Sequence, residues 1–373
     1  MKIIHTADIH LDSALGRHFD EKRAEERRNE ILATFRRMVN YASQNGVKAI
    51  LIAGDLFDSH KISPTARGAV ISAVMNHPDL TFFYLRGNHD EGSFEKEFAS
   101  GAGKLPENLK CFGEAWTSYT LSDNDTKVVI TGAELSGKNA SSLPGSLNLD
   151  PDMVNIVTLH GQETANQGKN DAEVISLPGY ANKGIDYMAL GHIHSPKIAT
   201  LDARGRYAYC GCLEGRGFDE IGKRGFYLLD IKEKTVNAEF VPFANRTVYD
   251  LGVSVADAVT SDEALEAVKE ELLRVGVLEK DMIKIRLQGS VDMDAEFDSA
   301  YIKTMLETEY YYVKVLNETT PVVDYAQFRH DASLKGEFVR RVLADKDGGL
   351  VTEDEAAEII RCGIHLLAGK EDF

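Results

Sequence analysis

The sequence predicts a layered α/β fold, in which a two-layered β core is flanked by helices. Two observations lead to this prediction. In residues 1–245, strand-like apolar runs alternate with helix-like runs, which is the pattern of an α/β domain. Five of the strand-like runs end in a short polar cluster rich in Asp, Asn and His. Because open α/β sheets bind ligands beyond the carboxyl ends of their strands, these clusters are expected to meet at one sheet edge.

The composition excludes several classes of protein. The 373 residues are 43% hydrophobic, which is enough for a sizeable core and too apolar for a disordered chain. No run approaches the ~20 apolar residues of a membrane span. Asp8, His10 and Asp12 interrupt the first apolar stretch, unlike in a secretory signal, so we expect a cytoplasmic protein. The four cysteines are too few and too irregular for a disulfide framework or a four-cysteine zinc site.

The net charge of −17 argues against a protein that binds nucleic acid by bulk electrostatics, since phosphate neutralisation needs Lys and Arg. It does not exclude a local basic groove. A cluster of acidic metal ligands also recruits divalent cations, whose positive charge the residue count omits.

The elements of the first domain are expected in a defined order. A first helix is expected over residues 20–42, where apolar side chains recur at helical spacing and the other face is charged. A second helix is expected to begin near Pro64, which suits a first turn, and to run towards Met75. Thr126–Gly132 alternates like a strand. Four later segments read as a run of antiparallel strands, at 197–201, 207–210, 226–231 and 238–243.

The composition changes near Asn245, and a small α+β domain is expected over residues 246–320. Thr260 and Glu263 have the spacing of a capping box at the start of its first helix. Its strands are expected at 247–253, 282–287 and 310–315, and its helices at 261–275 and 295–307. Residues 321–373 form a tail with helices expected at 325–343 and 353–367. Two such helices bury little alone, so we expect them to dock on the body or on a partner.

The polar clusters have the chemistry of metal ligands. Alternation along an extended chain places Asp8 and His10 on one side, and His192 with His194 repeats that spacing. Gly54 lets the backbone turn sharply at Asp55. Carboxylate, amide and imidazole donors together suit Mn²⁺, Fe²⁺, Zn²⁺ or Co²⁺. Seven ligands are too many for one ion, so two ions that share a bridging carboxylate fit the count. The clusters supply these donors: Asp8, His10, Asp55, Asn88, His89, His160, His192 and His194.

Each cluster taken alone has a simpler interpretation. An Asp or Asn before a helix is more often a cap than a ligand, and a lone His such as His160 is more often structural. Five compatible clusters in this order reverse that balance. Asp-x-His, Gly-Asp-x-x-Asp, Gly-Asn-His-Asp, a single His and Gly-His-x-His then resemble the signature of the calcineurin-like metallophosphoesterases over residues 1 to about 245.

Within that superfamily the chain resembles the SbcD-type DNA repair nucleases, and among them the YhaO-like branch. Residues 5–12 and 53–58, with the spacing to residues 191–194, carry this likeness. The resemblance implies a β-sandwich core over 1–245, a capping domain over 246–320 and a helical tail over 321–373. In this family the C-terminal helices dock on the coiled coil of an SbcC-type ATPase, which is therefore the expected partner.

The resemblance also implies roles for the site residues. One metal ion would be held by Asp8, His10, Asp55 and His194, and the other by Asp55, Asn88, His160 and His192. His89 would face the scissile phosphate and help the leaving oxygen to depart, and Asp90 would orient its imidazole. The expected metal is Mn²⁺, with Fe²⁺, Co²⁺ or Zn²⁺ as alternatives.

The predicted function is that of a Mn²⁺-dependent DNA phosphodiesterase in double-strand break repair, acting as an exonuclease and in some cases as a single-strand endonuclease. DNA contacts are expected from Arg17, Lys61, Arg67 and Arg216. A homodimer would use Ile71, Val74 and Met75, although we favour these as core residues. Two alternatives are a phosphoesterase acting on a nucleotide or other small phosphoester, which the acidic pI favours, and a non-catalytic scaffold.

Overall fold

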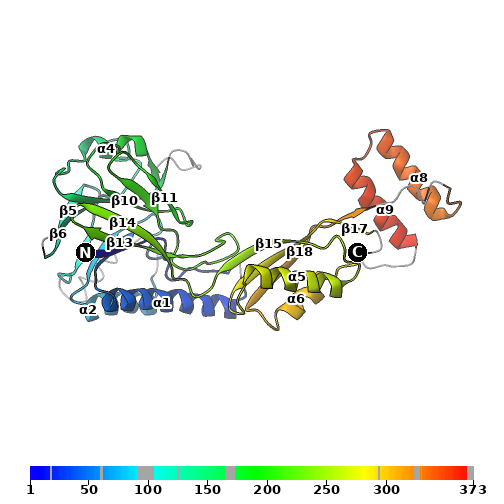
Figure 1. Cartoon of the computed structure of the whole chain (residues 1–373), viewed down its shortest axis with the longest axis horizontal. Coiled ribbons are helices and arrows are strands. Elements are labelled where there is room, and N and C mark those ends of the chain that lie inside the picture. The colour runs from blue at the N-terminus through cyan, green and yellow to red at the C-terminus, as the bar shows by residue number, and fades with distance from the viewer. Residues whose placement is uncertain are drawn as a thin grey trace. The chain divides into compact units, whose positions relative to one another are not determined.

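The computed structural model describes residues 1–16, 19–58, 62–90, 105–124, 126–163, 173–292, 295–322, 328 and 330–367. The chain divides into two compact units, Met1–Thr247 and Val248–Phe373 (Figure 1). Each unit has an apolar core of its own. Sheets flanked by helices make up both units, so the predicted α/β fold class is confirmed.

The first unit is built on two six-stranded sheets. One has the order β14-β13-β1-β2-β3-β4, with bounds Thr235–Pro242, Gly225–Lys232, Lys2–Thr6, Val47–Ala53, Thr81–Leu85 and Leu109–Cys111. The other has the order β11-β12-β10-β7-β6-β5, with bounds Lys197–Thr200, Arg206–Tyr209, Tyr187–Gly191, Val154–His160, Thr126–Gly132 and Thr117–Asp123. Two short strands, β8 (Gln162–Glu163) and β9 (Val174–Ile175), pair with each other.

The two sheets pack face to face as a sandwich, because one core cluster draws buried side chains from both. Ile3, Leu51 and Phe83 come from the first sheet, and Ile156 and Ala189 come from the second. Helix α1 (Glu21–Gln44) contacts β2, and α2 (Pro64–Asn76) contacts α1, so the two helices form a layer beside the first sheet (Figure 1). Strands β1, β2 and β3 are parallel, as are β7 and β10, so their carboxyl ends gather at shared edges.

The two long helices begin where local side chains cap them. Asp20 accepts from the backbone amide of Arg23 at 2.9 Å, and Ser63 accepts from that of Ala66 at 3.1 Å, directly before Pro64. These bonds satisfy amides that have no partner within a helix, which is why the predicted start of each helix is close to the observed one.

The run of four antiparallel strands expected after His194 is wrong in its pairing. β11 and β12 are antiparallel, but β12 pairs in parallel with β10. β13 then crosses to the first sheet, where it lies antiparallel to β1 and β14. Alternation along the chain marks a segment as a strand, but it does not specify which neighbour that strand will pair with.

A buried carboxylate ties α1 to the end of the first unit. Glu214 is only 1% exposed, and it accepts from Thr34 Oγ1 at 2.9 Å and from Arg27 Nη2 at 3.4 Å. It also accepts from the backbone amides of Asn245 and Arg246 at 2.7 and 3.1 Å. The charge is therefore fully partnered, as a buried carboxylate must be.

The second unit contains a three-stranded parallel sheet in the order β15-β16-β18, with bounds Val248–Ser254, Met282–Gln288 and Tyr312–Asn317. Helices α5 (Ser261–Val275) and α6 (Ser299–Leu306) pack on it through a shared core. The capping box predicted at Thr260 and Glu263 is confirmed, and α5 ends at Gly276 with φ 77°.

The rest of the second unit holds the pair β17 (Ser290–Asp292) and β19 (Thr320–Val322), followed by helices α8 (Leu334–Asp347) and α9 (Glu353–Leu367). The two helices share a small core that includes Val339, Val342, Ala356 and Ile360. α8 starts later than predicted because Ser333 caps it. Of the helices described, none has the length and apolar character needed to cross a membrane. The finer division into a capping domain and a tail at residue 320 remains our proposal.

Candidate metal centre

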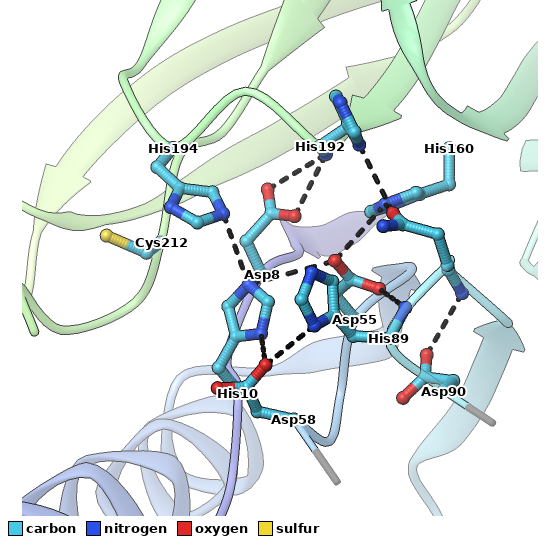
Figure 2. Close-up of polar contacts among 12 residues, drawn as sticks. Asp8, His10, Asp55, Asp58, His89, Asp90, His160, His192, His194 and Cys212 are labelled. Carbon is cyan, nitrogen blue, oxygen red and sulfur yellow. Dashed lines mark hydrogen bonds and ion pairs between the residues drawn. The ribbon is translucent and has the colours of Figure 1, made fainter. Parts of the chain in front are cut away.

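The structure brings the five polar clusters together at the carboxyl ends of β1, β2, β3, β7 and β10 (Figure 2). Backbone bonds join the loops that follow the first two strands, since Asp8 N donates to Gly54 O and His10 N donates to Asp55 O, both at 3.0 Å. The loops are tightly packed. A Cβ at Gly54 would lie 2.1 Å from His160 Nδ1, so a larger residue would displace that imidazole.

Four of the clustered residues have left-handed backbone conformations that side chains other than glycine rarely adopt. Their φ angles are 49° at Asp8, 51° at His10, 51° at Asp55 and 98° at His192. Each such residue costs on the order of 1–3 kcal/mol and persists only where the surroundings enforce it. Backbone strain of this kind concentrates at functional sites.

The first donor group consists of Asp8, His10, Asp55 and His194. His10 Nε2 lies 3.1 Å from His194 Nε2 and 3.7 Å from Asp55 Oδ2. Donor atoms of Asp8, His10 and His194 all lie within 4.8 Å of one another. Two nitrogens that bind one ion at about 2.0–2.1 Å are separated by roughly 3.0–3.4 Å, so the facing imidazoles fit a shared cation.

The second donor group consists of Asp55, Asn88, His160 and His192. Asn88 Oδ1 lies 3.0 Å from His160 Nε2 and 3.2 Å from His192 Nδ1. Asp55 Oδ2 lies 3.4 Å from His160 Nε2. The same oxygen therefore faces both donor groups, as a bridging ligand would. Mixed carboxylate, amide and imidazole donors suit a borderline-hard divalent ion.

The charges of the described site residues call for a cation. Asp8 and Asp55 are buried, at 0% and 1% exposure. Burial alone would lower the pKa of His160, but the charge of Asp55 outweighs burial and raises that pKa to about 10. Burial alone would raise the pKa of Asp55, but His160 and His10 hold that pKa well below its usual range. Buried negative charge that recruits a proton in this way recruits a metal ion as well.

Mn²⁺ is expected to raise the melting temperature of the metal-free protein, because it binds the folded site and not the unfolded chain. At 100 times the dissociation constant the gain is about 2.7 kcal/mol, or roughly 5–10 °C for a unit of this size. Scanning calorimetry with and without chelator measures it. Ca²⁺ serves as the matched ion, since it prefers oxygen ligands and should have little effect. A melting temperature that ignores Mn²⁺ would contradict the site.

The carboxylate that contacts His89 is Asp58, and the expected role of Asp90 is wrong. His89 Nδ1 lies 2.7 Å from Asp58 Oδ1, which also lies 3.3 Å from His10 Nδ1 (Figure 2). This hydrogen bond raises the pKa of His89. The side chain of His89 is 49% exposed, so the ring is accessible to substrate.

Asp90 is instead a buried acceptor for backbone amides. It accepts from Phe57 N at 2.8 Å, Gly87 N at 3.0 Å and Leu56 N at 3.2 Å. Burial and the nearby charge of Asp55 raise the pKa of Asp90 to about 7. Asp90 therefore shapes the loops that carry Asp55 and Asn88. Asp58 was present in the Gly-Asp-x-x-Asp motif, and its place in that motif was the available signal for its role.

Glu220 and Arg216 lie behind His194. Glu220 is 3% exposed, and its Oε1 lies 2.7 Å from His194 Nδ1. Arg216 donates to the same carboxylate through Nε at 3.0 Å and Nη2 at 2.9 Å, and its Nη1 lies 3.4 Å from Asp58 Oδ2. No motif pointed to Glu220, because its segment has no periodic pattern of its own.

Of the four residues expected to bind DNA, Arg67 and Arg216 are described by the structure. Arg17 and Lys61 lie outside the described residues. Arg67 Nη2 donates to Ile62 O at 3.3 Å. Arg216 is 17% exposed and paired with two carboxylates, so its charge is largely balanced within the site. Of the residues considered for a dimer, Val74 is buried, Ile71 is half-buried and Met75 is 56% exposed.

A cavity of about 390 Å³ adjoins the second donor group. Among the described residues, Arg86, Glu134 and Leu135 line it together with Asn88 and His160. Arg86 Nε donates to Glu134 Oε1 at 2.7 Å, so this guanidinium is also paired.

Comparison with known proteins identifies a matching family and several relatives of this chain. Residues 1–196 match the sequence model of a family described as calcineurin-like phosphoesterase. The uncharacterized metallophosphoesterase YhaO of Bacillus subtilis is 23% identical over 64% of this chain and 60% of its own length, so the chain spans about three fifths of it. The DNA double-strand break repair protein Mre11 of Sulfolobus acidocaldarius is 22% identical over 96% of this chain and 94% of that protein. The SbcD component of the nuclease SbcCD of Staphylococcus epidermidis is 24% identical over 65% of this chain and 69% of that protein.

Proposed function

The chain belongs to the calcineurin-like phosphoesterase family, and from this premise we propose that it is a Mn²⁺-dependent DNA phosphodiesterase, an exonuclease of double-strand break repair. The family predicted from the motifs is thereby confirmed, and the protein is a metallophosphoesterase. The proposal for DNA is supported most by the extent of one likeness. The match to Mre11 of Sulfolobus acidocaldarius covers 96% of this chain, and therefore both units.

The two donor groups would hold two divalent ions, with Asp55 between them. Ions bound there would supply charge neutralisation of the phosphate and activation of water for attack at phosphorus. The residues of the chain hold the donors in place. Gly87 allows the close approach, since a Cβ there would lie 2.1 Å from Asp55 Oδ1. His89 N donates to the same Oδ1 at 2.9 Å, which fixes the carboxylate.

His89 is proposed to give a proton to the leaving oxygen. Its Nδ1 is taken by Asp58, which leaves Nε2 as the ring nitrogen that faces away from that carboxylate. Asp58 raises the pKa of His89, so a larger fraction of the imidazole carries the proton at neutral pH. A positioned acid of this kind contributes about 10²–10⁴ in rate.

An SbcC-type coiled-coil ATPase is the partner that we propose for the second unit. Leu334 at the start of α8 is 69% exposed, Leu350 after it is 76% exposed and Leu366 in α9 is 54% exposed. Exposed large apolar side chains on these two helices and on the segment between them favour a docking surface for another chain. We propose that this assembly acts in the cytoplasm.

A small phosphoester remains the second candidate substrate, and the charge of the chain favours it. The net charge is −17, and Arg86 and Arg216, the arginines described beside the site, are both ion-paired. A protein that holds long DNA needs unpaired Lys or Arg along the backbone track. A nucleotide needs little beyond the metal centre.

A comparison of substrates separates the two candidates. The protein is given Mn²⁺ with end-labelled duplex DNA, single-stranded DNA, nucleotides or bis-p-nitrophenyl phosphate. We expect stepwise shortening of DNA together with cleavage of the small diester. The Asp55→Asn variant, purified identically, controls for contaminating nucleases. Turnover of nucleotides or the small diester with intact DNA would replace the nuclease by the phosphoesterase.

A further inference from the structure

We infer that the two donor groups bind metal unequally, with Glu220 as a positioning residue that makes the first group the tighter. This inference rests on the proposed metal site and concerns how the occupancy of its two positions depends on the metal concentration. Three differences between the groups support it: the charge of the donors, the partners behind the imidazoles, and the rigidity of those partners.

The first difference is the charge of the donors. The first donor group adds Asp8, a buried carboxylate, to the shared Asp55. The second donor group has the neutral amide of Asn88 at the corresponding place. A divalent ion gains more from two carboxylates than from one carboxylate and an amide, because each carboxylate brings a full negative charge into a site of low dielectric.

The second difference is what stands behind the imidazoles of the first donor group. His194 Nδ1 lies 2.7 Å from Glu220 Oε1, and His10 Nδ1 lies 3.3 Å from Asp58 Oδ1. Both rings are thus held with Nδ1 towards a carboxylate and Nε2 towards the other ring, 3.1 Å apart. A carboxylate behind a ligating imidazole fixes the tautomer and strengthens the nitrogen as a donor.

The second donor group has weaker partners. His160 Nδ1 faces the backbone carbonyl of Ala53 at 2.9 Å, which carries no net charge. His192 turns Nδ1 itself towards Asn88, and Glu173 Oε2 lies 3.7 Å from that nitrogen, beyond hydrogen-bond distance. Among the described residues, neither imidazole of this group has a carboxylate behind it in hydrogen-bond contact.

The third difference is rigidity. Arg216 holds Glu220 through Nε, Nη2 and its own backbone amide, the last at 2.6 Å. Its remaining Nη1 reaches Asp58 Oδ2 at 3.4 Å, and Ser13 Oγ donates to that same oxygen at 2.6 Å. The two carboxylates behind the first donor group are therefore joined through one largely buried guanidinium. They keep their orientation when metal leaves, which lowers the cost of rebinding.

Titration of the metal-free protein with Mn²⁺ tests the inference, with calorimetry and electron paramagnetic resonance as readouts that do not depend on activity. We expect a tight and a weak binding step in the wild-type protein. Glu220→Gln keeps the shape and removes the charge, so the tight step should weaken by about 10–100-fold while the weak step stays. Glu220→Asp should recover part of the loss.

Glu214→Gln is the matched control. Glu214 lies six residues earlier in the same segment, is buried to a similar degree and pairs with Arg27, but it contacts no histidine of the site among its described bonds. A loss of stability alone would therefore appear in both variants, whereas a loss of metal affinity should appear only in Glu220→Gln. His194→Ala and His192→Ala provide a second pair, expected to remove the tight and the weak step respectively.

The outcomes are distinct. Equal affinities in the wild-type protein, or the same Mn²⁺ affinity in Glu220→Gln as in Glu214→Gln, would overturn the inference and leave the proposed function standing. A wild-type protein that binds no Mn²⁺ would overturn the proposed function itself. If Glu220→Gln fails to fold, the His194→Ala and His192→Ala pair decides, because loss of the weak step by His194→Ala alone would reverse the assignment.

Discussion

Replacement of Asp55 by Asn is expected to abolish turnover, with a loss of at least about 10³-fold, and to leave the protein unable to retain two ions. The reason is that one carboxylate oxygen faces both donor groups, 3.4 Å from His160 Nε2 and 3.7 Å from His10 Nε2. Asparagine keeps the size and the acceptor for His89 N but removes the shared negative charge. Elemental analysis after dialysis and kcat on the small diester measure the two effects.

Asp186→Asn is the control for that variant. Asp186 also accepts bonds from Arg204 and a backbone amide, but it precedes β10 at the end away from the metal centre. It should keep both ions and nearly all activity. If Asp55→Asn retains as many ions as the wild-type protein under the same conditions, or more than about a tenth of wild-type turnover, Asp55 does not bridge.

His89→Ala is expected to keep both ions and to lose about 10²–10⁴ in kcat on DNA. The imidazole of His89 pairs with Asp58 and packs against the ring of His10. Its described contacts include no other proposed ligand. The loss should be smaller with bis-p-nitrophenyl phosphate, because its leaving group departs without a proton. Comparison of the two substrates therefore tests the role and not just the importance of His89.

The control for His89→Ala is His77→Ala, which removes an imidazole that contacts only the carbonyl of Ala73 among the bonds described for it. It should behave as wild type. Equal losses on DNA and on the small diester would make His89 a phosphate-binding residue and not an acid. An unchanged rate on DNA would remove it from the mechanism altogether.

The sequence revealed those parts of the site whose signals are local. Each proposed ligand stands at or just after the end of a parallel strand, and such ends meet at one edge whatever the rest of the chain does. The capping box at Thr260 is equally local, since three residues decide it. Asp58 is part of the Gly-Asp-x-x-Asp motif, but its contact with His89 depends on two loops that follow different strands.

The sequence could not predict the contact of Glu220 or the pairing of β13, and the reason is the same for both. Both depend on where the chain goes after β12, when it leaves one sheet and joins the other. That crossing is decided by packing of the two layers and leaves no periodic trace in the segment itself. His194 and Glu220 are 26 positions apart, and only the folded chain makes them neighbours.

The left-handed backbone at Asp8, His10, Asp55 and His192 has an evolutionary consequence. Glycine at any of these positions would relieve strain, so a lineage no longer selected for catalysis would gain stability from each ligand it discarded. Mutational drift should therefore erase such a centre quickly. A chain that still has non-glycine donors at these four strained positions is therefore expected to have remained under selection for catalysis. This argues against the non-catalytic scaffold.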